Sequence, residues 1–119
     1  MFGSIVVGTD GSETANEAVR QAVDLASAIG ARATMGHALN TLGLLTAYLG
    51  AVDDGLTMLR RALDIGRELG SADDTQRAYT NLQDVLIVAA ARFDEAAALG
   101  MEAIDPPGVR RPHVLWQWN

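Results

Sequence analysis

Apolar residues recur at steps of three and four along most of this chain, a spacing that predicts amphipathic helices. Polar and charged residues occupy the positions between them, as expected for helices with one buried face. We therefore expect a mainly helical protein with one compact core. The apolar stripes cover residues 15–29, 39–49, 56–69, 79–86 and 93–103.

Glycine and proline mark the expected ends of these helices. Gly30 can close the first helix in left-handed geometry, and Gly50 is expected to join the next two helices as an antiparallel hairpin. The pair Pro106-Pro107 stops helix formation, because proline lacks the N–H donor and disfavours helical geometry in the residue before it. These breaks divide the chain into segments 1–31, 33–105 and 106–119, which we expect to form one unit.

The N-terminal residues follow a different pattern. A short apolar run, Ser4 to Val7, leads into the turn residues Gly8 to Ser12, and this order predicts a strand and a tight loop before the first helix. A lone strand leaves its backbone groups unpaired. Two segments are candidates to pair with this strand: the alternating tail His113–Trp118, or the same strand of a second subunit. The predicted fold is mainly α, and α+β at the margin, with an N-terminal β-α unit followed by two antiparallel helical hairpins.

Between His37 and Asp105 the chain repeats itself at a spacing of about 40 residues, a period typical of helical-repeat scaffolds. Residues 77–82 repeat the pattern of residues 37–43. The later part of the second copy is displaced by one residue towards the C-terminus, which predicts a slightly longer turn in the second hairpin. Two hairpins are fewer than the three or so repeats usually needed, so exposed apolar edges favour a homodimer.

Charge and composition narrow the function. Fifteen acidic and nine basic residues give a net charge of −6, so a nucleic-acid backbone would be repelled. The chain has no cysteine and no lysine, which excludes thiolate zinc sites and lysine-based phosphate or Schiff-base chemistry. No apolar run approaches the roughly 20 residues of a membrane span. We expect a cytoplasmic protein that binds neither membrane nor nucleic acid.

Catalysis finds little support in the sequence. The two histidines, His37 and His113, stand in no recognisable nucleophile or acid-base setting and lack the spacing of a metal site. Paired carboxylates such as Asp53-Asp54 fall where helix starts favour negative charge. We therefore predict a non-enzymatic protein without a metal or cofactor.

Residues 33–105 resemble the tetratricopeptide repeats of bacterial regulators. The resemblance rests on Leu42-Gly43 in the first helix of a hairpin and on the run Gly50–Gly55 at the start of the next; Gln83 and Gly100 depart from the family pattern. It implies a scaffold that binds a protein or peptide partner in a groove lined by the first helix of each hairpin. The candidate groove residues are His37, Asn40, Leu44, Arg77, Thr80, Asn81 and Asp84.

Residues 1–31 resemble the opening strand and helix of universal stress proteins, through Ile5 to Ser12 and the helix that follows. That resemblance implies, as an alternative function, weak binding of an adenine nucleotide such as ATP at the loop before the helix. The family's glycine-rich phosphate loop has no match after Ala31. The chain thus reads as a chimera, natural or engineered, and a junction with no evolved function is a third alternative. The candidate nucleotide-binding residues are Thr9, Asp10, Gly11 and Ser12.

Overall fold

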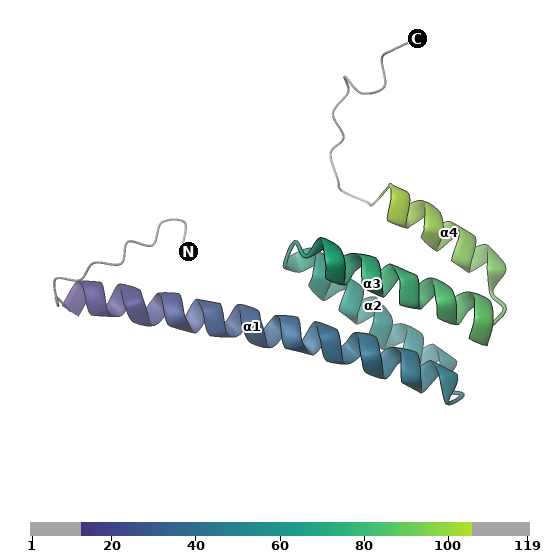
Figure 1. Ribbon diagram of the computed structural model, residues 1–119, viewed down its shortest axis with the longest axis horizontal. Helices are drawn as coiled ribbons and strands as arrows, with labels where there is room; N and C mark the ends of the chain where they lie inside the picture. Colours follow the sequence, from purple (N-terminus) through teal and green to yellow (C-terminus); the bar gives the residue numbers. More distant parts are fainter. Residues whose placement is uncertain (1–12, 106–119) are drawn as a thin grey trace, which may run out of the picture.

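A computed structural model describes residues 13–105 of the chain, and these residues form helices joined by short turns. Figure 1 shows a bundle from which the first helix extends. Strands are absent from the described range. In chain order the elements are α1 (Glu13–Tyr48), α2 (Val52–Glu68), α3 (Ala72–Asp84), the π-helical turn η1 (Val85–Ala89) and α4 (Phe93–Ile104).

Helix α1 corrects the predicted fold class. It runs without interruption for 36 residues, so the helix expected to close at Gly30 continues into the first helix of the bundle. A glycine inside an exposed helix costs only about 1 kcal/mol, and good helix formers such as Ala31 and Ala33 surround this one. The prediction of a separate N-terminal β-α unit was therefore wrong. The strand expected at residues 5–7 and the tail at 113–118 lie outside the described residues.

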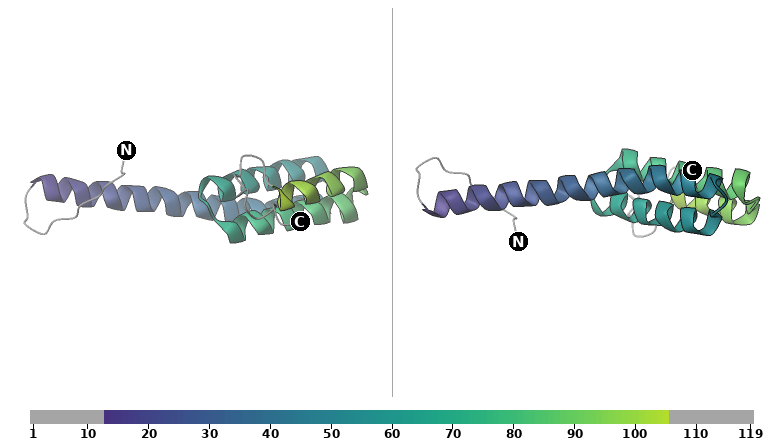
Figure 2. Two further views of the ribbon diagram at one scale, coloured as in Figure 1. Left: turned by 90° about the horizontal axis from the view of Figure 1, so that it is seen from above. Right: turned by 90° about the horizontal axis from the view of Figure 1, so that it is seen from below.

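The second half of α1 forms an antiparallel hairpin with α2, and α3 with η1 forms another with α4 (Figures 1 and 2). Leu59, Leu63 and Leu82 are fully buried at the centre of the bundle, where the apolar stripes of the helices meet. The described part of the chain thus contains the two hairpins that the periodicity predicted. The first half of α1 extends beyond them (Figure 2).

Two glycines allow α1 and α2 to approach closely. A Cβ atom on Gly43 would lie 2.9 Å from the carbonyl oxygen of Gly55, and one on Gly55 would lie 2.5 Å from the carbonyl oxygen of Gly43. Both residues are buried. The backbones of the two helices therefore touch at this point, and only glycine fits there without moving them.

The connection between the two hairpins is a tight turn that ends in a helix cap. Gly70 has a φ of +65°, in the left-handed region that favours glycine. The hydroxyl of Ser71 then accepts a hydrogen bond from the backbone N–H of Asp74 at 3.2 Å, which caps the start of α3.

The extra residue that displaces the second repeat by one position lies in η1, and the expected longer turn was wrong. Three residues separate α1 from α2, and three separate η1 from α4, so the two turns have the same length. In η1 the N–H of Ala90 donates to the oxygen of Val85 five residues earlier, at 3.1 Å. A π-helical turn of this kind accommodates one extra residue within a helix.

The two departures from the repeat pattern compensate for each other. Gln83 is long where a small residue is expected, and its amide donates to the carbonyl oxygen of Ala96 at 3.1 Å. A Cβ atom on Gly100 would lie 2.9 Å from that amide nitrogen. Because Gly100 has no side chain, α4 leaves room for the Gln83 side chain.

Candidate functional site

The candidate groove residues lie where α1 and α3 run side by side, and four of them form hydrogen bonds across this junction. Nε2 of His37 lies 2.9 Å from Oδ1 of Asp74, and the amide of Asn81 donates to Oδ1 of Asn40 at 3.2 Å. Further along, the hydroxyl of Tyr48 donates to the carboxylate of Asp84. These contacts form a line of polar pairs between the two helices.

Asn40 lies inside this junction rather than on an open surface. It is 2% exposed, and its Nδ2 is buried without a hydrogen-bond partner. Leu44 is half-buried and packs against the core. A peptide therefore cannot reach Asn40 while α1 and α3 remain packed together.

The remaining groove candidates face solvent. Arg77 is exposed, and the hydroxyl of Thr80, also exposed, donates to the carbonyl oxygen of Gln76 in its own helix at 3.0 Å. The α1–α3 face is thus a polar helix junction flanked by exposed side chains. The sequence placed these residues on one face, but it gave no signal that they would pair with each other.

Tyr48 has a raised pKa, chiefly because its hydroxyl donates to the Asp84 carboxylate. Loss of the phenolic proton would break that hydrogen bond and place two negative charges together. The pair therefore ties the end of α1 to the end of α3 at neutral pH.

A second polar cluster holds α4 against the bundle, and the sequence reasoning did not find it. One guanidinium nitrogen of Arg67 lies 2.9 Å from Oε1 of Glu102, and the hydroxyl of Tyr79 donates to the same oxygen at 3.2 Å. The Arg67 guanidinium also lies 5.3 Å from the Tyr79 ring centre, within cation-π range. The members come from α2, α3 and α4 and are far apart in sequence, so a local sequence motif could not have predicted this cluster.

Burial of Glu102 disfavours its charged form, but hydrogen bonds from Arg67 and Tyr79 and the charge of Arg60 outweigh that effect and lower its pKa. The shift identifies Glu102 as an ionised carboxylate held by its partners. The cluster joins three helices, so we assign it a structural role.

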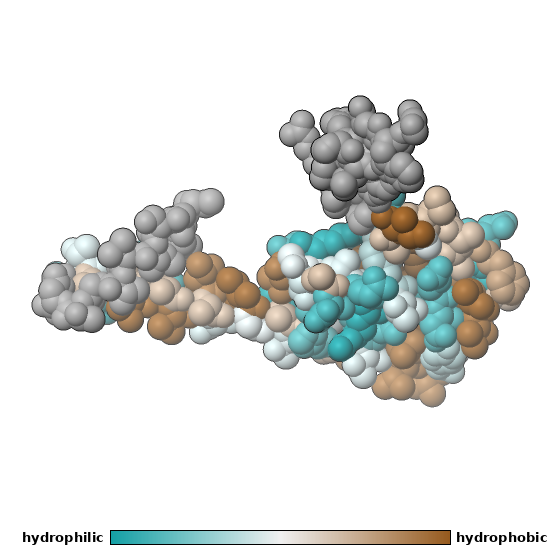
Figure 3. Space-filling model, turned by 45° about the horizontal axis from the view of Figure 1, so that its top comes forward, coloured by the Kyte–Doolittle hydropathy of each residue, from teal (hydrophilic) through white to brown (hydrophobic). Residues whose placement is uncertain are grey.

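Exposed apolar side chains gather where the C-terminal end of α1 adjoins η1. Leu49 is 88% exposed and Val88 is 64% exposed, values unusual for side chains of this size in a bundle. Figure 3 shows apolar side chains at this end of the bundle, away from the projecting part of α1. We call this surface the end patch; it consists of Leu45, Tyr48, Leu49, Ile87 and Val88.

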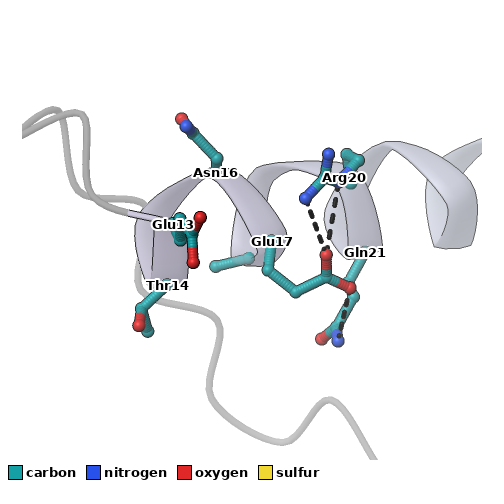
Figure 4. A pocket seen from close by; sticks show the side chains of 7 residues that line it. Glu13, Thr14, Asn16, Glu17, Arg20 and Gln21 are labelled. Carbon is teal, nitrogen blue, oxygen red and sulfur yellow. Dashed lines mark hydrogen bonds and ion pairs between the residues drawn. The ribbon is translucent and has the colours of Figure 1, made fainter.

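The N-terminal end of α1 directly follows the candidate nucleotide-binding residues in the sequence. Figure 4 shows a shallow hollow there, lined by side chains of the first two turns, in which Glu17 accepts hydrogen bonds from Arg20 and Gln21. Glu13 adds a second carboxylate, and the hollow's one cation among the described residues, Arg20, is paired with Glu17 at 2.9 Å. The unpaired charge that the described residues bring to this hollow is negative, and it would repel a phosphate group. The candidate residues Thr9 to Ser12 lie outside the described range.

The described residues hold neither a metal cluster nor a membrane span. In the range 13–105, no three side chains of the metal-binding types come together. None of the described helices combines the length and the apolar composition that crossing a membrane requires.

Comparison with known proteins gives one family match. The sequence model of the universal stress protein family matches residues 1–98, which includes α1, α2, α3 and the start of α4. No curated protein and no solved structure matches the chain. The match extends well past the N-terminal 31 residues whose motifs resemble this family. The resemblance to tetratricopeptide repeats stays a prediction from the residues.

Proposed function

The chain belongs to the universal stress protein family, and from that premise we propose that it is a non-enzymatic member that acts by binding another protein. The observation that carries the proposal is the end patch, where large apolar side chains of α1 and η1 are exposed together. An apolar surface of this kind on a small protein is typical of an interaction site. The polar pairs between α1 and α3 and the cluster around Glu102 hold the helices that present this patch.

In this proposal the two helical hairpins act as the scaffold that presents the patch. The helices that open the two hairpins, α1 and α3, lie side by side. The end patch lies on the last turn of α1, on Leu49 just beyond it, and on η1, which follows α3. Leu45 and Leu49 are one turn apart, and Ile87 and Val88 extend the surface from the second hairpin. An amphipathic helix of a partner would find an apolar strip here that spans both hairpins.

Photo-crosslinking tests this surface. A photoreactive amino acid replaces Leu49 or Val88 in the full chain, and the matched control carries it at Asp64, an exposed position on α2. We expect discrete adducts with the same protein from both patch positions and none from position 64. Equal labelling at all three positions, or no adduct at the patch, would refute a binding site there.

A second candidate function is weak binding of an adenine nucleotide. The family match covers Thr9 to Ser12, which immediately precede α1 in sequence, and a helix N-terminus favours an anion. The carboxylates of Glu13 and Glu17 count against it. Isothermal titration with ATP separates the two functions: heat that disappears in Asp10→Ala supports nucleotide binding, and no heat at millimolar ATP excludes it.

A further inference from the structure

Acidic residues border the end patch. They stand at the start of α2, at the end of α3 and at the start of α4: Asp53, Asp54, Asp84, Asp94 and Glu95. The segments that form this end of the bundle, residues 45–57 and 84–95, contain one cation, Arg92, and it forms a 2.8 Å ion pair with Asp53. The border of the patch therefore carries an excess of negative charge, which favours an occupant with positive charge.

Among the described residues nothing covers the apolar centre of this patch, since Leu49 is 88% exposed. The rest of the chain lies in two segments, 1–12 and 106–119. Residues 1–12 cannot reach the patch. They precede Glu13, which the 36 residues of α1 place about 53 Å from Tyr48, because a helix rises about 1.5 Å per residue (Figure 2). Twelve residues span at most about 43 Å when fully extended.

Residues 106–119 follow α4, which begins beside η1, and they can reach the patch. The 12 residues of α4 carry the chain about 17 Å away from that end of the bundle. About five extended residues span the same distance. Residues 105–109 can therefore return the chain to the start of α4, which leaves residues 110–118 to lie across the patch.

The same segment also matches the patch in charge and hydropathy. Residues 106–119 contain two arginines, Arg110 and Arg111, and no acidic residue, although the whole chain has a net charge of −6. Large apolar residues follow the arginines: Val114, Leu115, Trp116 and Trp118. Arginine and tryptophan are among the residues that contribute most to binding surfaces. Residues 1–12, by contrast, carry one charged side chain, that of Asp10.

We propose that residues 110–118 of the same chain occupy the end patch. The two arginines lie against the carboxylates at the start of α4, and the tryptophans lie over the apolar side chains of α1 and η1. A short connection within one chain gives an effective concentration in the millimolar range, so even a weak contact is populated. The inference rests on the proposed binding function of the patch: the segment covers the patch while the partner is absent, and the partner displaces it.

Tryptophan fluorescence of the full chain tests the inference, because its two tryptophans are Trp116 and Trp118. Acrylamide quenches an exposed indole more strongly than a covered one. We expect the wild-type chain to have a quenching constant severalfold lower than that of a synthetic peptide of residues 106–119, with emission at a shorter wavelength.

Two matched variants locate the contact. Val88→Arg removes an apolar side chain from the patch and adds a charge that repels the arginines, whereas Val23→Arg makes the same change on the first half of α1. The two valines are 64% and 57% exposed, so neither change disturbs the core. We expect Val88→Arg to raise the quenching constant to that of the peptide and Val23→Arg to leave it at the wild-type value.

Charge reversal tests the role of the carboxylates. Arg110→Glu combined with Arg111→Glu should raise the quenching constant, and so should Asp94→Arg combined with Glu95→Arg. All four changes together should restore the wild-type value, because they exchange the two signs. Circular dichroism checks that each variant keeps the helical bundle.

A wild-type chain that is quenched like the peptide overturns the inference, and so does protection that survives Val88→Arg or is not restored by the exchange of signs. Protection that falls on dilution, with a mass of twice 12.6 kDa in light scattering, also overturns it, because the segment then comes from a second copy.

Photo-crosslinking at Leu49 decides the proposed function separately. Adducts from a chain with uncovered tryptophans uphold the patch as a binding site and refute only its cover. Covered tryptophans without adducts, even in the chain with Arg110→Glu and Arg111→Glu, refute only the partner.

Discussion

The close contact between α1 and α2 makes a sharp prediction about three glycines. Gly43 and Gly55 lie where the two backbones touch, whereas a Cβ atom added to Gly30 of α1 would have no heavy atom within 4 Å beyond its own helical backbone. All three are inside helices, so replacement by alanine brings the same intrinsic gain in helix stability, about 1 kcal/mol. Any difference between the variants therefore reports packing.

The packing cost at Gly55 falls on atoms that cannot rotate away. An added Cβ would lie 2.5 Å from the carbonyl oxygen of Gly43 and 2.7 Å from the backbone nitrogen of Ala47. Because both are backbone atoms, the helices must separate, which loosens the core around Leu59. Overpacking of this kind costs about 1–3 kcal/mol, so after the helix gain we expect Gly55→Ala to lose up to about 2 kcal/mol.

Thermal unfolding followed by circular dichroism measures the difference. For a domain of this size, 1 kcal/mol shifts the melting temperature by about 4–8 °C. We expect Gly55→Ala to melt below wild type by roughly that amount or more, Gly43→Ala to shift in the same direction, and Gly30→Ala to melt at or above wild type. If Gly55→Ala proves as stable as Gly30→Ala, the two helices do not touch as described.

Three further predictions concern single residues of the bundle. Asn81→Ala should lower the free energy of unfolding by about 1–3 kcal/mol, because it leaves buried Asn40 without its partner. Asn40→Ala should cost less, because the half-exposed Asn81 that it leaves can bond to water. Equal losses of the two variants in denaturant unfolding would contradict this. Ala91→Gly should raise stability by up to about 1 kcal/mol, since Ala91 has a φ of +53°, and an unchanged or lower melting temperature would count against that strain. The lowered pKa of Glu102 adds stability that is present above the unfolded-state pKa and is lost as the pH falls through the folded-state pKa. The melting temperature of Glu102→Gln should therefore fall less steeply in acid than that of wild type. Parallel curves of melting temperature against pH would refute the role of this carboxylate.

The sequence predicted what depends on local periodicity. Stripes at steps of three and four identified every helix of the bundle, and Gly50, which was expected to join two helices, lies in a turn with a positive φ. The Gly30 prediction failed for an equally physical reason. A glycine closes a helix only when the chain turns there, and the stripe from Ala26 to Ala33 continues across it in the same register.

The missed features depend on residues far apart in the chain. Gln83 and Gly100 each look like a defect in the repeat, and only their contact across α3 and α4 shows that one allows the other. The sequence put the groove candidates on the two neighbouring helices α1 and α3, but their bonds across the junction, such as Asn81 to Asn40, follow from the distance between these helices. Periodicity gives the direction of a side chain and leaves open how closely the opposite helix approaches.

The continuous helix α1 connects the family match with the bundle. The family match covers the whole of α1, and among the described helices it is the second half of α1 that packs in the bundle. A helix of about 18 residues gains little stability in water from helix formation alone. Helicity at residues 13–30 must therefore come from the packed second half of α1, from whatever covers the first half, or from both.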